Sequence, residues 1–592
     1  MSPITHDLSH PEGIHRTATA VDAAANAYTQ RLLDLDPGFA TELGRPGHES
    51  EYRDFSPAGL GAAADAARHA LTELDGLAPV DAVDRTTLHA MGERLGLSVE
   101  LYETGWPLAE LNNIASPAQE IRAIFDLMPT ATVSDWEHIS GRLANVPGAI
   151  DGYIASLRAG AGRGLVAARR QVSTVIQQCE RHAGAQGFFL TLARDAVLDS
   201  PSADSTASYS AAADGTASND AGHALPASVA TELLGNAEVA RAGYRKLATF
   251  LREELLPQAP EADAVGAERY ALASRTFLGS AVDLEETYAW GVAELDRVIA
   301  EQEAVAQAIQ HGASIAEAKA ILNADPARQL HGTAALTEWM QGLSNAAVAD
   351  LARTHFDIPE VMRTLECKIA PTQDGGIYYT GPSEDFTRPG RMWWSVPEGE
   401  DSFSTWAETT TVYHEGVPGH HLQVGTATYQ AGLLNEWRRN ACWVSGHGEG
   451  WALYAERLMD SLGYLSDPGD RMGMLDGQRM RAARVVFDIG VHLGLEIPAQ
   501  WGTGTWTADA GFEFLKANLD ISAGQLEFEF NRYLGWPGQA PSYKIGQRLW
   551  EEIRDSRAAQ DGAAFSLRDF HTQALNLGSV GLDTLKMALL GS

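Results

Sequence analysis

The sequence predicts a mainly α-helical protein with a small β-sheet beside a helix that carries histidines. Three observations support this fold class. Long Ala-rich segments have apolar residues three and four positions apart, which is the period of an amphipathic helix. Two short aromatic and β-branched segments follow Pro359 and are bounded by Gly and Pro, as is typical of strands. Between Thr405 and Gln423, a helical run leads into a His-Glu pair and a His-His pair.

Size and charge limit the classes of function. A chain of 592 residues exceeds what one small core needs, so we expect one large unit or two interlocked units. The net charge of −34 argues against nucleic acid and anionic membranes as partners. Cys179, Cys367 and Cys442 are odd in number and far apart, which indicates a reducing compartment without disulfides. The first thirty residues lack the pattern of a signal peptide and no run is long enough to span a bilayer, so we expect a cytoplasmic protein.

The predicted organisation has three parts. Residues 1–196 form a helical N-terminal half, residues 197–228 a low-complexity surface loop rich in Ser, Ala, Asp, Gly and Thr, and residues 229–592 a second helical half that contains the small sheet and the histidines. The N-terminal half contains few candidate functional residues, and we expect it to form the wall of a cleft. Helical periodicity is clearest in the segments 21–35, 60–74, 85–101, 165–182, 229–256 and 284–309.

The two predicted strands cover residues 375–381 and 391–396. An exposed edge strand can hold an extended peptide by backbone pairing. Tyr379 lies in the first predicted strand and is therefore a candidate substrate-binding residue. The alternative is a hairpin that serves only packing.

The helix before the histidines is expected to begin at Thr405, because Thr405-Trp406-Ala407-Glu408 has the form of a capping box. In the zinc motif H-E-x-x-H, two histidines at i and i+4 bind the ion and the Glu activates water. Here His414 and Glu415 fit the motif, but position i+4 is Pro418.

The second ligand must then be His420 or His421. On a straight helix with about 100° and 1.5 Å per residue, His420 points away from His414 and His421 lies about 10 Å too far along. Pro418-Gly419 can interrupt the helix and loop out, which would bring His420 into the ligand position. Alternatively, the Pro-Gly pair is an ordinary helix end, where histidines are favoured by the dipole.

A third ligand is available downstream. Glu449 and Glu456 lie seven residues apart on one face of the helix predicted around Ser445–Leu458. A Glu on a second helix completes a two-His zinc site and leaves a position open for water. We therefore expect Glu449 to bind the metal and Glu456 to support a ligand. A favourable charge in a first helical turn is the simpler explanation for Glu449 taken alone.

Two further segments carry polar groups. In the helix predicted over Gln478–Leu495, Arg481, Arg484, Asp488 and His492 form a polar stripe among apolar residues, which is expected to face a wet cavity. Either arginine could bind a substrate carboxylate, and Asp488 and His492 could order the site together with His421. The turn-rich segment 532–546 includes Lys544 as a candidate substrate contact and Tyr543, whose phenol could donate to an oxyanion.

Three motifs in this order resemble the bacterial domain-of-unknown-function family 885. They are His414-Glu415-Gly416-Val417-Pro418-Gly419-His420-His421-Leu422-Gln423, then Glu449 to Glu456, then Arg532-Tyr533 through Lys544-Ile545-Gly546. The segment Asp36 to Gly44 is also similar, so the resemblance covers nearly the whole chain.

The resemblance implies a zincin-like, mostly helical ellipsoid with a deep cleft, similar to angiotensin-converting enzyme and the thimet oligopeptidases. Those relatives have H-E-x-G-H, whereas this chain keeps Gly419-His420 but adds two residues.

The expected function is zinc-dependent hydrolysis of short peptides, as an oligopeptidase or a carboxypeptidase. Zn²⁺ held by His414, His420 and Glu449 would polarise the carbonyl, Glu415 would move a proton from water to the leaving amine, and Tyr543 would steady the oxyanion. A non-peptide amide hydrolase and an inactive peptide-binding relic are the alternatives. Two His and one Glu also accept Mn²⁺ or Co²⁺. The oligomeric state is left open.

Overall fold

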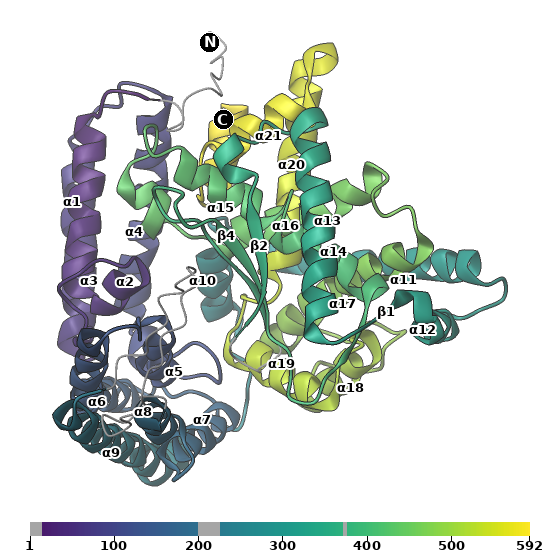
Figure 1. Ribbon diagram of the computed structural model, residues 1–592. Helices are drawn as coiled ribbons and strands as arrows, with labels where there is room; N and C mark the ends of the chain where they lie inside the picture. Colours follow the sequence, from purple (N-terminus) through teal and green to yellow (C-terminus); the bar gives the residue numbers. More distant parts are fainter. Residues whose placement is uncertain (1–14, 199–224, 371–375, 592) are drawn as a thin grey trace, which may run out of the picture. The chain divides into compact units, whose positions relative to one another are not determined.

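The computed structural model describes residues 15–198, 225–370 and 376–591, and these are mainly helical (Figure 1). The helices before the sheet are α1 (Ala20–Leu35), α2 (Pro37–Glu42), α3 (Pro57–Asp75), α4 (Ala82–Thr104), α5 (Pro117–Ala123), α6 (Val133–Gly162), α7 (Arg169–Ala183), α8 (Phe188–Leu198), α9 (Ala227–Phe250), α10 (Ala267–Leu278), α11 (Leu284–Ile309), α12 (Ile315–Ala324) and α13 (Thr333–Thr354).

The helices after the sheet are α14 (Thr405–Glu415), α15 (His420–Tyr429), α16 (Ser445–Ser461), α17 (Pro468–Leu493), α18 (Ala508–Asn518), α19 (Ala523–Gly535), α20 (Ser542–Asp561), α21 (Leu567–Leu575) and α22 (Leu582–Leu590). Each helix predicted from periodicity is present, with ends that differ by a few residues. Among the described residues, no helix is both long and apolar enough to cross a membrane.

The chain divides into two compact units that do not follow the predicted halves. One unit comprises Gln30–His69 and Ser98–Asp263, and the other comprises Met1–Thr29, Ala70–Leu97 and Ala264–Ser592. Long-range contacts explain the difference from the predicted division. For example, Asn435 donates hydrogen bonds to Asp22 and to Thr87, so early helices join the C-terminal part of the chain. Most of the predicted loop 197–228 lies outside the described residues.

The unit that contains residues 98–263 is a helical bundle. Helix α9 packs on α6, α7 and α8, and its apolar face buries Leu233, Tyr244 and Leu247. The packing is close where Gly243 faces Ile150 of α6, since an added Cβ would lie 3.1 Å from that side chain. This unit therefore has a hydrophobic core of its own.

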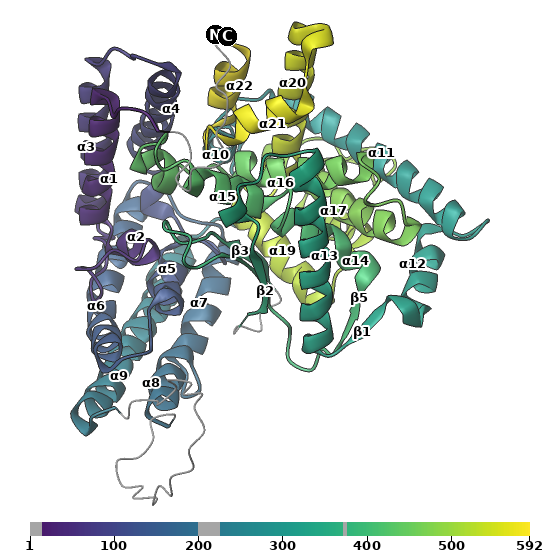
Figure 2. The same cartoon turned by 45° about the horizontal axis from the view of Figure 1, so that its top comes forward.

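The other unit contains both small sheets (Figure 2). Strand β4 (Gly390–Trp394) lies between β2 (Leu365–Ile369), which runs parallel to it, and β3 (Ile377–Thr380), which runs antiparallel. The two predicted strands thus correspond to β3 and β4. One face of this sheet packs on Leu336 and Met340 of α13.

A second sheet leads directly into the histidine helix. Strand β1 (Gln329–His331) pairs antiparallel with β5 (Ser402–Ser404), and α14 begins at the next residue. The predicted helix start at Thr405 is confirmed, but the predicted capping box is wrong. Ser404 occupies the cap position, and the Thr405 hydroxyl donates to the carbonyl oxygen of Arg328 instead.

Candidate metal centre

The Pro-Gly segment interrupts the helix, as predicted. Helix α14 ends at Glu415 and α15 begins at His420, so residues 416–419 form the break. Gly419 is required there, because a Cβ at this position would lie 1.8 Å from the carbonyl oxygen of His414. The indole of Trp451 on α16 donates to the carbonyl oxygen of Pro418 at 2.9 Å and fixes the break against the next helix.

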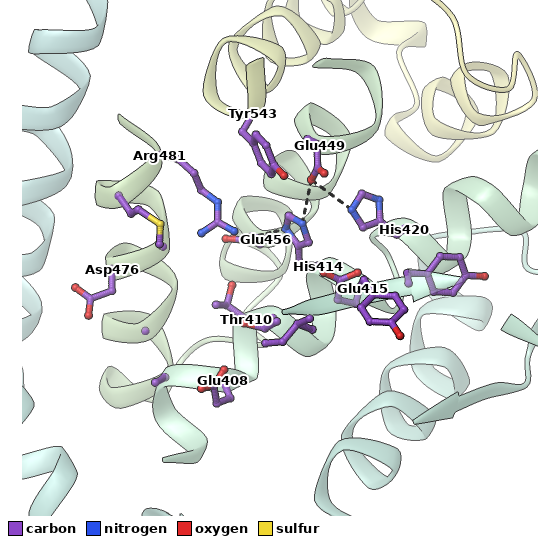
Figure 3. Close-up of a pocket in the computed structure, with 18 of the residues that line it drawn as sticks. Glu408, Thr410, His414, Glu415, His420, Glu449, Glu456, Asp476, Arg481 and Tyr543 are labelled. Atoms are coloured by element: carbon purple, nitrogen blue, oxygen red, sulfur yellow. Dashed lines mark hydrogen bonds and ion pairs between the residues drawn. The ribbon is translucent and has the colours of Figure 1, made fainter. Parts of the chain in front are cut away.

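This break brings His414, His420 and Glu449 together. The Nε2 atoms of both histidines lie 3.4 Å from Oε2 of Glu449, and the three potential ligand atoms lie within 4.8 Å of one another. The two imidazole rings are perpendicular, with centroids 4.9 Å apart. Figure 3 shows the three side chains converging from α14, α15 and α16. Two imidazoles and one carboxylate could bind a divalent cation such as Zn²⁺.

Glu456 supports His414 from behind. Its Oε1 accepts a hydrogen bond from Nδ1 of His414 at 2.8 Å, which leaves Nε2 as the atom with a free lone pair. Burial is the largest single effect and raises the pKa of Glu456, but the hydrogen bond from His414 and the positive charge of Arg481 act together in the opposite direction, and the pKa is lowered. The predicted role of Glu456 as support for a ligand therefore agrees with the geometry.

His421 does not join the cluster. Its Nδ1 lies 2.9 Å from the hydroxyl of Tyr379 and its Nε2 lies 2.7 Å from the carbonyl oxygen of Met362. Both ring nitrogens are thus occupied elsewhere, which leaves His420 as the second histidine beside His414. His421 instead fixes α15 against the sheet.

Glycines on α16 and α20 allow a close approach that positions Glu449. A Cβ on Gly450 would lie 2.5 Å from the backbone of Gly546, and a Cβ on Gly546 would lie 2.1 Å from the carbonyl oxygen of Gly446. Helix α20 therefore lies directly on α16. Tyr543, in the first turn of α20, points toward Glu449 as a result (Figure 3).

The cluster lies in a pocket of about 670 Å³, within the size range of small-ligand sites. Glu415 and Tyr543 also line it. Burial raises the pKa of Glu415, although both histidines act in the opposite direction. Burial and the neighbouring Glu449 raise the pKa of Tyr543 to about 12, so its phenol keeps its proton. The pocket thus combines a carboxylate that can accept a proton with a hydroxyl that can donate a hydrogen bond.

The polar stripe of α17 is divided between two environments. Arg481 and Arg484 line the pocket, but Arg484 is also bound by the hydroxyl of Tyr533 at 2.6 Å and by Glu529 at 3.1 Å. Asp488 and His492 lie further along the helix and do not reach the cluster. Asp488 accepts from Tyr270 and from the backbone of Gly538, and His492 contacts the carbonyl oxygen of Tyr533. In contrast to the predicted position close to the site, both residues contact the 533–538 turn and neither contacts a member of the cluster.

Tyr379 lines the pocket, whereas Lys544 does not. The structure places Lys544 outside the pocket, in contrast to its predicted position, because α20 begins at Ser542 and its helical turn directs Lys544 away from Tyr543. The buried ammonium contacts Gln547 at 2.9 Å, Glu294 at 2.8 Å and also Gln478. Since Gln478 in turn donates to Glu456, Lys544 supports the polar network behind His414.

Some pocket residues escaped the sequence-based prediction. Glu408 is the clearest case, since it lies seven residues before Glu415 on α14 and thus on the same face of that helix. The same spacing rule would have found it. Asp476, Met480 and Trp443 also line the pocket, and no motif marks them.

The model of the family described as "Bacterial protein of unknown function (DUF885)" matches residues 37–589. The chain belongs to this family. The predicted family is therefore confirmed, while the zincin relationship stays a prediction. No protein with a curated description matches the chain.

Two solved structures share the DUF885 chain's fold. A protein described as a putative lipoprotein from Colwellia psychrerythraea is 22% identical, with a TM-score of 0.80 over 97% of this chain and 99% of that one. A protein from Shewanella oneidensis, described as a putative lipoprotein of unknown function, is 14% identical, with a TM-score of 0.69 over 97% and 100%. At these identities the similarity shows the fold alone. The expected cytoplasmic location stays a prediction.

Proposed function

We propose that this DUF885 protein is a zinc-dependent hydrolase that cleaves peptide bonds of short peptides. The observation that carries the proposal is the convergence of His414, His420 and Glu449 within 4.8 Å, beside Glu415, in one pocket. Zincin-like peptidases use the same combination of two histidines, one glutamate ligand and one glutamate base.

The donor set fits Zn²⁺. The side-chain hydrogen bond to Glu456 orients His414, as outer carboxylates do for metal-bound histidines. Glu415, Glu449 and Glu456 also make the cluster acidic, which favours a cation. When bound, the ion supplies a Lewis acid that polarises the amide carbonyl and acidifies water.

The other steps belong to the chain's own residues. Glu415 accepts a proton from the attacking water and delivers it to the leaving amine, for which its raised pKa is suited. Tyr543 donates its hydroxyl hydrogen to the oxygen atom on which negative charge develops, and its proton is retained because its pKa is about 12. The buried walls around His414 and Glu415 keep bulk water away from both groups.

The first test is metal stoichiometry by elemental mass spectrometry on protein purified without an affinity tag. We expect about one zinc per chain, and loss of zinc in His414→Ala and in His420→Ala. His421→Asn is the matched control, because both ring nitrogens of His421 are occupied outside the cluster. Absence of zinc from wild type, or its retention in His420→Ala, would exclude this ligand set.

The second test separates metal binding from catalysis. Glu415→Gln is expected to keep zinc but to lose about 10²- to 10⁴-fold in turnover on a short-peptide library, because the amide cannot accept a proton. Unchanged turnover would eliminate Glu415 as the base. Zinc binding without cleavage of any peptide by wild type would instead favour a non-peptide amide substrate or a non-catalytic peptide-binding protein.

A further inference from the structure

Most charged side chains in the pocket have partners within the chain. His414, His420, Glu449 and Glu456 contact one another, and Arg484 contacts Glu529. Asp476 and Asp520 also line the pocket, and both contact Lys319, at 2.5 Å and 3.2 Å. Apart from the base Glu415, two charged residues of the described lining are left, and they have opposite signs: Arg481 and Glu408.

Arg481 lies within electrostatic range of Glu456 and Glu415, but neither carboxylate is in contact with it in the described residues. Within the described residues its guanidinium makes no hydrogen bond and no ion pair, and its buried Nε has no acceptor. Its guanidinium carbon lies 6.0 Å from the centroid of the Tyr543 ring. Figure 3 shows the guanidinium pointing into the pocket beside Glu456. A planar guanidinium with unused donors is suited to bind a carboxylate through two hydrogen bonds.

Glu408 is the complementary anion. It lines the same pocket, and no cation contacts it in the described parts of the chain. Burial and the charge of Glu400 raise its pKa to about 7, and no cation among the described residues acts against them. A cationic ligand would supply that stabilisation. Glu408 lies six residues before His414 on α14, which corresponds to roughly 9 Å along the helix axis.

This spacing suits a short peptide. An extended chain advances about 3.3 Å per residue, so roughly 9 Å is spanned by three residues or by one long basic side chain with its backbone. The pocket of about 670 Å³ admits only a small ligand, so a terminus of the peptide would lie inside it. A peptide terminus carries a charge, and the described pocket lining offers one cation and one anion that form no ion pair within the chain, Arg481 and Glu408.

We propose that the pocket selects short peptides with a free C-terminal carboxylate, which Arg481 binds, and a cationic group, which Glu408 binds. The cationic group is either a basic side chain or the N-terminal ammonium. The identity of the ligand as a peptide rests on the proposed function, but the binding test below does not depend on turnover.

The experiment is isothermal titration calorimetry on full-length Glu415→Gln protein with Zn²⁺, using four probes. They are Ala-Lys-Ala, its C-terminal amide, its N-acetyl form and Ala-norleucine-Ala. We expect the amide to bind about 10- to 100-fold more weakly than the free acid, because a charge-assisted hydrogen-bond pair is lost. We expect a similar loss for one of the other two probes, which identifies the source of the cation.

Two additional substitutions assign each preference to its residue. Arg481→Gln should bind the acid and the amide equally, and Glu408→Gln should lose the preference for the cation while keeping the preference for the acid. Arg353→Gln, at an exposed arginine of α13, is the control and should keep both preferences. Melting temperatures close to that of the parent protein would show that the variants fold.

Equal binding of the acid and the amide by the parent protein would overturn the inference, and so would no binding of Ala-Lys-Ala. The inference would also be overturned if Arg481→Gln kept the preference for the free acid and Glu408→Gln kept the preference for the cationic group. If wild type cleaves none of these peptides although the binding preferences are present, the proposed function fails and the inferred recognition stands.

Discussion

Asp488 is a fully buried carboxyl whose two oxygen atoms have different surroundings. Oδ1 accepts from the hydroxyl of Tyr270 at 2.6 Å and from the backbone N–H of Gly538 at 2.9 Å, whereas Oδ2 has no partner among the described residues. Burial raises the pKa of Asp488 from 3.8 to about 7. The folded protein therefore retains a proton at Asp488 that the unfolded chain releases.

The sign of the resulting pH dependence follows from linkage. The stabilising effect of this proton is complete below the unfolded pKa of 3.8 and is lost as the pH rises through about 7. At about 1.4 kcal/mol per pKa unit, a shift from 3.8 to about 7 corresponds to a loss of roughly 4 kcal/mol. Asp488→Asn keeps an acceptor for Tyr270 and cannot ionise. We expect its melting temperature to exceed that of wild type at pH 8 and to approach it at pH 5, as measured by calorimetry. A constant difference across this range would contradict the prediction.

At the scale of elements, the contact between α16 and α20 determines the geometry of the site. It depends on backbone meeting backbone at Gly450 and Gly546, where an added Cβ would lie 2.5 Å or less from main-chain atoms. If the two helices moved apart, Glu449 on α16 or Tyr543 on α20 would be displaced. Gly450→Ala is therefore expected to destabilise the protein by about 1–3 kcal/mol and to weaken zinc binding.

Thermal melting and zinc titration check this prediction. Gly342→Ala in α13 is the matched control, because nothing lies within 4 Å of the added methyl group. At that position alanine should be neutral or stabilising by up to about 1 kcal/mol, as is usual in an open helix interior. If Gly450→Ala behaved like the control, the close approach of α16 and α20 would not be needed for the site.

The elements show what the sequence could and could not reveal. Helices α1, α9 and α11 follow from periodicity, and the break before His420 follows from the stereochemistry of Pro418-Gly419. Lys544 was misplaced because its direction depends on where α20 begins, and the proline-rich turn conceals that start. Pairing across elements, such as that of Lys319 with Asp476, has no local signal at all. For the same reason, only the folded chain shows that Arg481 and Glu408 form no ion pair among the described residues.

At the scale of the whole molecule, the described residues of the metal centre belong to one unit. The pocket is lined by residues from Ile377 to Tyr543, whereas the bundle of α6, α7 and α9 belongs to the other unit and has its own core. Bound metal raises the free energy of only those local unfolding reactions that disrupt the site. At a metal concentration about 100-fold above Kd, this contribution is roughly 2.7 kcal/mol.

Hydrogen exchange can test whether the metal acts on one unit alone. Removal of zinc with a chelator is expected to accelerate exchange in α14, α15 and α16 by about 100-fold, the factor that corresponds to this free energy. Exchange in α6 and α9 should be unchanged, because no ligand comes from their unit. The His414→Ala variant should show no response to the chelator. An equal acceleration in α6 and α9 would mean that the two units open together, and no acceleration in α14 to α16 would mean that the cluster holds no metal.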